Sequence, residues 1–595
     1  MNNYKRVLIL YGSQTFTAQE IAERIWRNTK ILGFRGPVLA MDDYPIIDLR
    51  NEEFVIFVCA TTGQGEVPDN MKKFWRFLLR RNLPPNCLMK LKIGVLALGD
   101  SSYAKFNFAG KMLHKRLLQL GAESLINIGL CDYQHDLGHD GVAIPWLKEY
   151  FSALKTYFPD IETNDLKTEF VPRWKVSLIK TQEKLHERLE KDIYYETGWK
   201  DPFNNAIHLE VEKNERTTSE KHFQDVRLMT FKTIEEDKLD YNPGDIFNIR
   251  PRNSTEDVED LFSIFEAHGL DIKPQYKLQV DKHYDDMPVP EFLKTPLTLY
   301  DIAKQYWDLK AYPTQYFFSL LAVVAEDKLE REKCIELSSP SGQEDFLNYS
   351  RRPKRTPLEV LKDFHKTASK LTIEIIFELF SSIKPRSFSI ASSALVSHSR
   401  VDLLMAVVQY HTVIKRPRLG LASNWLKGLA PGDRVYGWIK KGSFVFPDYP
   451  TPIIMIGPGT GLAPFRSLLQ QRRCLGTLGH GTHHLVFGCR YRERDFHCRR
   501  EIEEMADEGQ LSLYCAFSRD QERKIYVQHK IREHSKTFWQ LIADQNAHIF
   551  VSGNAKSMPE EVREAFIEVC RNGDTDPAAF VEEMERTGRY QAETW

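Results

Sequence analysis

Residues 451–466 combine an apolar strand, a glycine-rich turn and the start of a helix. The stretch has the sequence T-P-I-I-M-I-G-P-G-T-G-L-A-P-F-R, with Gly457, Gly459 and Gly461 in the turn. Glycines there let the backbone approach a diphosphate, and the free amides of the helix N-terminus attract its charge. A lone G-x-G-x-G is weak evidence. The prediction of a parallel α/β nucleotide-binding unit therefore depends on the strand before the turn and the helix after it.

A second informative strand, Arg386–Ser393, has the sequence R-S-F-S-I-A-S-S. Alternate side chains of a strand point to opposite faces, so Arg386 and Phe388 share one face while Ser387 and Ser389 share the other. A guanidinium suits a pyrophosphate, and a flat ring with a small hydroxyl suits a flavin. Without partner motifs, an amphipathic barrel strand with no ligand would be an equally good interpretation.

Taken together, R-x-F-S-I-A-S-S and G-P-G-T-G-x-A-P-F-R resemble the ferredoxin-NADP reductase family. This resemblance implies a β-barrel that binds FAD, followed by a doubly wound domain that binds NADP(H).

The composition is that of a globular multidomain protein. With 595 residues the chain is too long for a single core, and three or four domains are expected. The formal net charge is −1, from 81 Lys and Arg against 82 Asp and Glu. This balance argues against a protein whose main activity is nucleic-acid binding.

Cysteine usage and hydropathy bear on the compartment. The nine cysteines form no C-x-x-C pair, so we expect reduced, mostly buried thiols, no metal site and a cytoplasmic protein. The N-terminal residues run straight into a strand, which leaves no room for a signal peptide or anchor. The longest mostly apolar run, Phe317–Ala325, is about half of what a bilayer requires. We therefore expect a soluble chain.

The N-terminal part begins with a buried type of strand, Arg6–Tyr11, and a helical pattern at Ala18–Leu32. The loop between them, Gly12–Gln19, offers hydroxyls and helix-start amides to a phosphate, and it contains no lysine or arginine. Uncharged capture of a monophosphate is how flavodoxins hold FMN. A hydroxyl-rich cap on an ordinary helix is the alternative.

Two further strands lead into polar loops. Phe54–Ala60 is followed by T-T-G-Q-G-E, and Ile93–Leu98 by G-D-S-S-Y-A-K-F-N, while a fourth loop is expected at 130–133. Open α/β sheets bind ligands at such carboxyl ends of strands. Over residues 5–150 the loops resemble the FMN loops of flavodoxin-like domains. A flavodoxin-like domain that precedes the ferredoxin-NADP reductase motifs is similar to the arrangement in the diflavin reductases, so the resemblance narrows to that family.

By this resemblance Tyr103 stacks on the flavin, with Phe106 behind it. Two departures weaken the site, because Phe16 stands where the family often has glycine, and Thr62 where the P450-reductase branch has a second stacking aromatic. We expect FMN to be bound, but more loosely than in that branch. The implied FMN residues are Ser13, Gln14, Thr15, Phe16, Thr17, Ala18, Ala60, Thr61, Thr62, Gly63, Leu98, Gly99, Asp100, Ser101, Ser102, Tyr103, Ala104, Lys105, Phe106, Asn107 and Asp132.

The middle of the chain predicts a barrel with an insertion. Leu154–Trp199 is charged and lacks a clear sheet pattern, which indicates a linker with a helical or edge-strand segment. Ala206–Arg250 shows short alternating strands, and helical spacing dominates residues 255–380, as in the connecting insert of diflavin reductases. The predicted fold is multidomain α/β plus β, with a flavodoxin-like domain (1–152), a linker (153–200), a β-barrel FAD domain with a helical insert (201–446) and a doubly wound NADP-binding domain (447–595).

Two more stretches resemble FAD-contacting segments. In the cationic run 351–356, R-R-P-K-R-T, the family's usual arginine aligns with Lys354; a solvated loop is the alternative. Leu419–Leu426 resembles the family's G-x-[AS]-[ST] helix start, which can receive the FAD pyrophosphate. The implied FAD residues are Lys354, Arg386, Ser387, Phe388, Ser389, Gly420, Leu421, Ala422, Ser423 and Trp595.

Ser518–Gln528, S-R-D-Q-E-R-K-I-Y-V-Q, gathers cations, a hydroxyl and a phenol after a predicted strand. Such groups form a phosphate pocket, with Tyr526 to cover an adenine, whereas NAD sites tend to place a carboxylate at the ribose. The stretch predicts selection of NADPH through its 2'-phosphate; a surface charge run is the alternative. The implied NADP residues are Thr460, Ser518, Arg519, Lys524, Ile525, Tyr526, Val527, Gln528 and Glu561.

The end of the chain supplies the remaining catalytic candidates. In the family a terminal aromatic covers the isoalloxazine until nicotinamide displaces it, which implies this role for Trp595; fraying is the alternative. Glu593 stands where relatives carry a catalytic carboxylate, and Ser552 stands where P450-type reductases carry a cysteine. The resemblance implies hydride transfer from NADPH to FAD, with Ser389 hydrogen-bonding at the transfer site and Glu593 stabilising the nicotinamide.

The resemblance as a whole implies that FAD passes electrons singly to FMN, and FMN to a one-electron acceptor protein. A-T-T-G-Q-G, L-G-D-S-S-Y-A-K-F-N and S-G-N-A-K-S-M are most similar to the diflavin reductases of cytosolic iron-sulfur assembly, which implies an anamorsin-type iron-sulfur protein as acceptor. A soluble reductase for methionine synthase or a P450-type acceptor is the alternative, although methionine synthase reductase has a longer linker. An FMN-poor docking module and an FAD-only reductase also stay open.

Overall fold

The computed structural model divides the chain into two units. The first comprises Met1–Asn204, Pro251–Lys384 and Gln409–Leu421, and the second comprises Asn205–Arg250, Pro385–Val408 and Ala422–Trp595. Ala104 and most of the predicted linker lie outside the described residues. None of the helices among the described residues has the length and apolar character that a bilayer span requires. The structure describes residues 5–63, 65–103, 105–160, 170–181, 193, 206–234, 238–479, 481–573 and 576–595.

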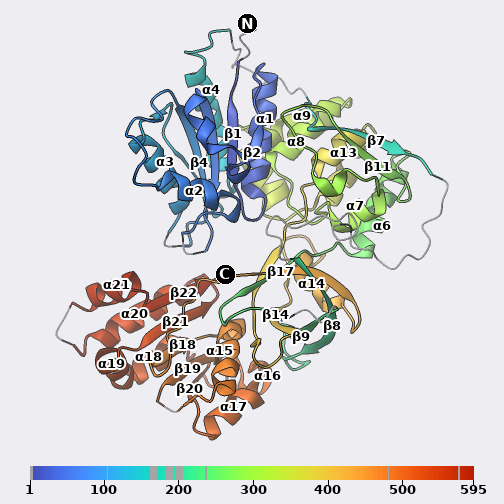
Figure 1. The fold of residues 1–595 in the computed structure, drawn as a ribbon. Coiled ribbons are helices and arrows are strands. Elements are labelled where there is room, and N and C mark those ends of the chain that lie inside the picture. The colour runs from blue at the N-terminus through green and yellow to red at the C-terminus, as the bar shows by residue number, and fades with distance from the viewer. Residues whose placement is uncertain are drawn as a thin grey trace. The chain divides into compact units, whose positions relative to one another are not determined.

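The first unit contains a parallel sheet (Figure 1). Its strands pair in the order β2-β1-β3-β4-β5, and β6 also pairs with β4. The apolar runs predicted as the first, second and third buried strands correspond to β1, β3 and β4, and those predictions are confirmed. The bounds are β1 (Leu8–Gly12), β2 (Val38–Ala40), β3 (Phe54–Ala60), β4 (Lys92–Gly99), β5 (Glu123–Ser124) and β6 (Gly129–Asp132).

Helices cover both faces of this sheet. α2 (Lys72–Leu78) and α3 (Phe108–Gln119) bury Phe74, Leu113 and Leu117 in one core cluster with strand residues. Figure 1 shows α1 (Thr17–Ile31) on the opposite side of the sheet. The last helix of this domain is α4 (Asp140–Leu154).

The insert is largely helical, as expected, and five of its helices begin at side-chain caps. Ser254 accepts a hydrogen bond from the Asp257 amide, and Thr298, Thr314, Asp327 and Thr356 cap later helices in the same way. Each cap satisfies an amide that a helix start leaves free. The bounds are α6 (Thr255–Ala267), α7 (Leu299–Gln305), α8 (Gln315–Val324), α9 (Lys328–Ser338), α10 (Gln343–Phe346), α11 (Pro357–Asp363), α12 (His365–Ala368) and α13 (Ile373–Leu379).

The first unit also contains a small sheet that the helical periodicity of the insert did not reveal. β7 (Trp174–Ile179), inside the predicted linker, pairs antiparallel with β11 (Lys277–Lys282), which pairs with β12 (Leu297–Thr298). β11 has the sequence K-L-Q-V-D-K, with only two apolar residues, so its strand character depends on its partner. The linker's expected edge-strand segment is therefore present as β7.

Buried ion pairs join α1 to the insert within the first unit. Arg27 of α1 and Arg173 both contact the carboxylate of Glu378 in α13, and Arg173 also pairs with Glu23 at 2.7 Å. Although burial alone would raise the pKa of Glu378, the two arginines lower it. Because removing one member of such a network leaves a buried charge uncompensated, the α1 side of the sheet is firmly attached to the insert.

The second unit contains an antiparallel six-stranded sheet in the order β13-β10-β17-β8-β9-β14. A bridge between Ile390 and Leu403 connects its two ends, so the sheet closes into the predicted barrel. The bounds are β8 (Ala206–Arg216), β9 (Val226–Thr233), β10 (Ile246–Ile249), β13 (Arg386–Ser389), β14 (Arg400–Ala406) and β17 (Arg434–Lys440). The short pair β15 (Gln409–Tyr410) and β16 (Arg418–Leu419) belongs to the first unit, and α14 (Leu421–Gly428) follows it.

A five-stranded parallel sheet in the order β20-β19-β18-β21-β22 completes the second unit (Figure 1). Its edge strand β22 is formed by the last residues of the sequence, and the sequence pattern there did not predict a strand. The bounds are β18 (Ile453–Ile456), β19 (His483–Cys489), β20 (Ser512–Phe517), β21 (His548–Gly553) and β22 (Tyr590–Thr594). The helices are α15 (Ala463–Cys474), α16 (Arg492–Asp495), α17 (Arg499–Asp507), α18 (Val527–Glu533), α19 (Ser535–Asp544), α20 (Met558–Cys570) and α21 (Pro577–Arg586).

Candidate functional site

The three predicted FMN loops follow β1, β3 and β4, which are neighbours in the sheet, so they meet at one edge. The amide of Ala109 donates to Thr61 Oγ1 at 3.3 Å, which links the second loop to the start of α3. A Cβ on Gly65 would lie 2.7 Å from Lys105 Cδ, so the second and third loops are in contact. The structure therefore brings the loops together in the arrangement that a flavin site needs.

Burial separates the side chains at this edge that can face a ligand from those that cannot. The side chains of Ala18, Leu98 and Asn107 are buried, and Asn107 Nδ2 donates to the carbonyl of Cys131 at 3.1 Å. We expect these residues either to contact the ligand through backbone groups or to hold the loops in place. The hydroxyl of Ser13 is buried without a hydrogen-bond partner among the described residues, which fits a phosphate oxygen.

The backbone conformation at Phe16 explains why the family often has glycine at this position of the phosphate loop. It directly precedes α1 with φ 65°, in the left-handed region that favours glycine. A non-glycine residue there costs on the order of 1–3 kcal/mol. The loop is nevertheless held by Gln14, whose side chain exchanges hydrogen bonds with Asp69 at 2.8 and 3.1 Å.

Asp132 braces the third loop rather than starting a fourth one. Residues 130–132, expected in a loop after a strand, belong to β6 itself, which corrects that prediction. The carboxylate of Asp132 accepts from the amides of Ser101 and Gln134 at 2.9 and 3.0 Å. Partial burial acts in the opposite direction, but these hydrogen bonds lower the pKa of Asp132, so the brace is charged at neutral pH.

The first loop has a cation nearby that the sequence did not reveal. Lys384, at the end of the insert, places Nζ 3.1 Å from Thr17 Oγ1 and 2.8 Å from Glu20 Oε2. The loop itself contains no lysine or arginine, so its phosphate capture was expected to be uncharged. No local pattern could have identified Lys384, because it is separated from Thr17 by most of the first unit's sequence.

The FAD candidates fall in both units. In the second unit, β13 pairs with β10, and Ser387 Oγ donates to Asn248 Oδ1 at 2.7 Å. Arg386 and Ser387 are exposed, whereas Phe388 packs against the barrel core, so its ring is less available than the sequence suggested. Ser423 Oγ, in the first turn of α14, accepts from the amide of Val408 at 2.9 Å. The exposed guanidinium and the helix start suit a pyrophosphate.

In the first unit, Lys354 belongs with Gly420 and Leu421. Its backbone has φ 55°, and its ammonium lies 4.7 Å from the centre of the Tyr312 ring. Burial, together with Arg351, lowers the pKa of Lys354. Of its cationic neighbours, Arg352 pairs with Glu344 and Arg355 with Asp363, whereas Lys354 forms no ion pair with the residues that the structure describes.

Arg466 connects the strand after β13 to the glycine turn, a role that sequence reasoning did not assign. Its Nη1 donates to the Ala391 carbonyl at 2.7 Å and to Asp402 Oδ2 at 2.9 Å, and its Nε donates to Glu501 Oε2 at 2.7 Å. Ser467 Oγ donates to the Ser392 carbonyl at 2.5 Å. These bonds position the predicted flavin strand relative to α15, which begins at the nucleotide turn.

The NADP candidates gather at the carboxyl edge of β18, β19 and β20. A Cβ on Gly488 would lie 2.8 Å from Val527 Cγ1 and 3.3 Å from Pro458 Cβ, so the glycine turn and the start of α18 both lie close to the end of β19. Arg519 and Lys524 are exposed and form no ion pair within the described residues, which fits a 2'-phosphate. Val527 is buried in the core and can offer only its backbone.

The remaining NADP candidates lie in the glycine turn and in or next to α18 and α20. Tyr526 is exposed and stacks on His529 with ring centroids 5.9 Å apart. Gln528 is buried and donates from Nε2 to Glu561 Oε2, which connects α18 to α20. Thr460 lies in the 3-10 helix Gly459–Leu462, half-buried.

The end of the chain is held in place rather than frayed. The Trp595 amide donates to the Gly553 carbonyl at 3.0 Å, and the Ala555 amide donates to the Trp595 carbonyl at 3.0 Å. Glu593 lies opposite Ser552 in the β21–β22 register, and Ser552 is fully buried without a hydrogen-bond partner for its hydroxyl among the described residues. The Trp595 side chain is 47% exposed, so its ring is free to cover a ligand.

Replacing Trp595 by serine should raise turnover with NADH relative to NADPH several-fold, up to about tenfold. Aromatic stacking is worth about 0.5–1.5 kcal/mol, a factor of roughly 2 to 13. NADH, which has no 2'-phosphate anchor, gains most when no ring must be displaced. Steady-state kinetics with both nucleotides measures the ratio, and Trp595→Phe is the control, since it keeps a ring. An unchanged ratio in Trp595→Ser would contradict the stacking role.

Comparisons with known proteins agree with this arrangement. Three family models match the chain, namely flavodoxin over residues 9–146, an FAD binding domain over 201–425 and an oxidoreductase NAD-binding domain over 455–564. They confirm the predicted fold class.

Full-length relatives are similar along the whole chain. Proteins named NADPH-dependent diflavin oxidoreductase 1 from Danio rerio, Xenopus laevis and Arabidopsis thaliana are 44%, 43% and 35% identical over 603, 605 and 627 residues. Each alignment covers 99% of this chain and 99% of the relative. This chain therefore belongs to the NADPH-dependent diflavin oxidoreductases, enzymes whose cofactors are FMN, FAD and NADP(H).

Proposed function

We propose that this enzyme delivers electrons from NADPH to an anamorsin-type iron-sulfur protein and acts in cytosolic iron-sulfur cluster assembly. The observation that carries the proposal is the full-length identity of 44% to a diflavin oxidoreductase, together with the similarity of A-T-T-G-Q-G, L-G-D-S-S-Y-A-K-F-N and S-G-N-A-K-S-M to that branch. Two of these stretches lie at the FMN edge of the first unit, where an acceptor protein would take up electrons. The proposed location is the cytoplasm.

In this proposal each cofactor would be held by its own set of residues. The Ser13 hydroxyl and the α1 amides would bind the FMN phosphate, with Tyr103 stacked on the ring. Arg386 and the start of α14 would bind the FAD pyrophosphate, and Arg519 with Lys524 the NADP 2'-phosphate. When bound, the two flavins supply the change from two-electron to one-electron transfer.

The chain's own groups would then orient the reacting rings. Ser389 is the last residue of β13, and its hydroxyl would donate a hydrogen bond to the flavin. The Glu593 carboxylate would stabilise positive charge on the nicotinamide. Trp595 would cover the flavin face and exclude water until nicotinamide binds. The backbone bonds of Trp595 to Gly553 and Ala555 support this role, because they hold the last residue in position.

The first test is flavin content followed by turnover. We expect about one FMN and one FAD per chain, as the family's cofactor set requires. NADPH should then bleach the visible absorbance of an oxidised anamorsin-type protein in an anaerobic cuvette. Faster activation of methionine synthase, or no reduction of the iron-sulfur protein by a chain that reduces cytochrome c, would exclude the proposed acceptor. FAD without FMN would support the docking-module alternative.

A further inference from the structure

Helices α2 and α3 and the segments beside them concentrate positive charge. Between residues 72 and 120 there is one acidic residue, Asp100, in a chain whose formal net charge is −1. We call the cations of this segment the basic face. They are Lys72, Lys73, Arg76, Arg80, Arg81, Lys90, Lys92, Lys105, Lys111, Lys115 and Arg116.

The two helices form one continuous surface. Both pack into the same core cluster, on the side of the sheet opposite α1 (Figure 1). Arg116 of α3 donates to the carbonyls of Leu78 and Arg80 at 2.7 and 3.2 Å, which ties α3 to the end of α2. The α1 side is attached to the insert by ion pairs, so the basic face is the side of this sheet that the insert's ion pairs leave uncovered.

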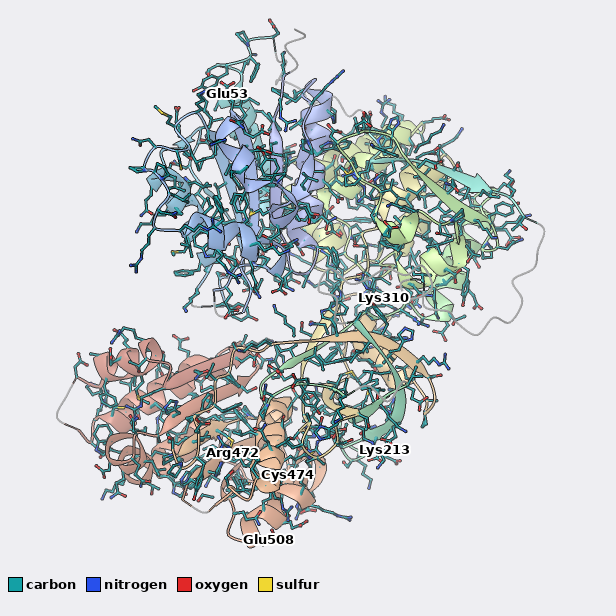
Figure 2. The ribbon with its side chains drawn as sticks, viewed as in Figure 1. Glu53, Lys213, Lys310, Arg472, Cys474 and Glu508 are labelled. Carbon is teal, nitrogen blue, oxygen red and sulfur yellow. The ribbon has the colours of Figure 1, made fainter. Side chains whose placement is uncertain are left out.

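The charge of the basic face is largely uncompensated. Lys72 pairs with Asp69, and Lys92 lies 3.6 Å from Glu53, which Figure 2 labels. The other nine cations form no ion pair with any residue that the structure describes, although the carboxylates of Asp42 and Asp43 lie beside Lys73. Cations held close together without counter-charges repel one another, so an acidic partner that neutralises them gains free energy on binding.

Apolar side chains are exposed among these cations. Leu79, Met89, Phe108, Met112 and Leu118 are 50%, 72%, 41%, 39% and 41% exposed. An apolar patch surrounded by charge is typical of protein interaction sites, whereas a phosphate backbone would leave such side chains unpaired. The surface therefore favours a polypeptide over a nucleic acid.

The basic face begins at the FMN edge. Phe108, the first residue of α3, directly follows the third FMN loop, and a Cβ on Gly65 of the second loop would lie 3.2 Å from its ring. Lys111 donates from Nζ to the Phe106 carbonyl at 2.9 Å. A partner docked on α3 would thus lie next to the edge from which electrons leave.

We infer that the basic face docks an acidic polypeptide segment with interspersed apolar residues, carried by the electron-acceptor protein. The identity of that protein rests on the proposed function, but the docking chemistry does not. Carboxylates would contact the cations of α2 and α3, and apolar side chains would cover Met112 and its exposed neighbours.

The direct test uses the full-length flavin-loaded protein and a fluorescein-labelled peptide of alternating glutamate and leucine. Fluorescence anisotropy should show binding that weakens as salt rises from 50 to 200 mM, because the pairs are solvent-exposed (Debye length about 10 Å at 0.1 M). The variant Arg80→Glu/Lys115→Glu should raise Kd by about tenfold or more, because two rim charges worth up to about 1 kcal/mol each are reversed. The control Arg50→Glu/Lys148→Glu reverses two exposed cations of the same domain outside the basic face and should change Kd less than twofold.

Four results would overturn the inference. These are no peptide binding, equal weakening in both variants, tighter binding of a glutamate-serine peptide that lacks apolar residues, and tighter binding of a single-stranded oligonucleotide or of phosphatidylserine vesicles. Ferricyanide reduction by NADPH should stay within twofold in both variants, which verifies their folding. If Arg80→Glu/Lys115→Glu fails this check, Met112→Ser/Leu118→Ser provides the same comparison through the apolar contacts.

Steady-state kinetics with the acceptor protein distinguishes the docking surface from the proposed acceptor identity. With an anamorsin-type protein, the KM for the acceptor should rise in Arg80→Glu/Lys115→Glu while kcat at saturation stays the same. Peptide binding without reduction of that protein would refute the proposed acceptor and leave the docking surface intact. Reduction with an unchanged KM would refute the docking surface and leave the acceptor intact.

Discussion

Replacing Arg466 by methionine should destabilise the second unit by about 3–5 kcal/mol, because it leaves partly buried Asp402 and Glu501 without their shared cation. Burial alone would lower the pKa of Arg466, but Cys498, Glu501 and Asp402 raise it overall, so the guanidinium is charged in the folded state. The Ala391 carbonyl would also lose its donor. At roughly 2–4 °C per kcal/mol, the unfolding transition of the second unit should move down by about 10 °C.

The measurement is a thermal melt of the full chain, followed by FAD and FMN fluorescence on release. FAD should be lost early and FMN at its normal temperature, since the Arg466 contacts all lie in the second unit. Arg473→Met is the matched control on the same helix. Its partners, Glu504 and Glu508, form a more exposed pair worth about 0–1 kcal/mol. Equal shifts for the two variants would show that the buried network does not hold the second unit together.

Removing both Arg519 and Lys524 should raise the KM for NADPH by about 100-fold and leave NADH nearly unaffected. Each charge-assisted hydrogen bond to a 2'-phosphate is worth about 1.5–3 kcal/mol, and NADH has no group to make it. Both side chains are exposed and form no ion pair within the described residues, so their loss should not disturb folding.

Steady-state kinetics of Arg519→Ala/Lys524→Ala with both nucleotides gives the comparison. The double variant Arg500→Ala/Lys536→Ala removes two exposed cations of the same unit outside the proposed 2'-phosphate site, and it should change neither KM by more than about twofold, as for surface charges in general. A parallel loss for NADPH and NADH would mean that the two residues support the loop and do not select the phosphate.

Local sequence patterns predicted the helices and strands whose conformation follows from residues close to them in the sequence. Buried apolar runs identified β1, β3, β4 and β18, and helical spacing identified α1 and α8, because burial on both faces or on one stripe requires those patterns. Strand-to-loop spacing also predicted which loops share a sheet edge. The glycine turn before α15 was equally clear, since Gly459 has φ 59°, a conformation that side chains disfavour.

Elements and residues that depend on distant partners required the tertiary structure. β7 and β11 are strands that pair with each other, and β22 pairs with β21; each is short, so the partner strand is what identifies it. Lys384 reaches the first FMN loop, and Arg466 reaches Asp402, across long stretches of chain. The packing of Phe388 against the barrel core likewise depends on side chains from other strands.

The sequence by itself thus determined the order of the domains, the cofactor edges and the kind of enzyme, because these follow from short motifs with local geometry. The tertiary structure decided which charges remain uncompensated. The eleven cations between residues 72 and 120 are visible in the sequence, but only packing shows that α2 and α3 share one face and that ion pairs occupy the other. Charge neutralisation depends on neighbours in space, and spacing along the chain does not reveal them.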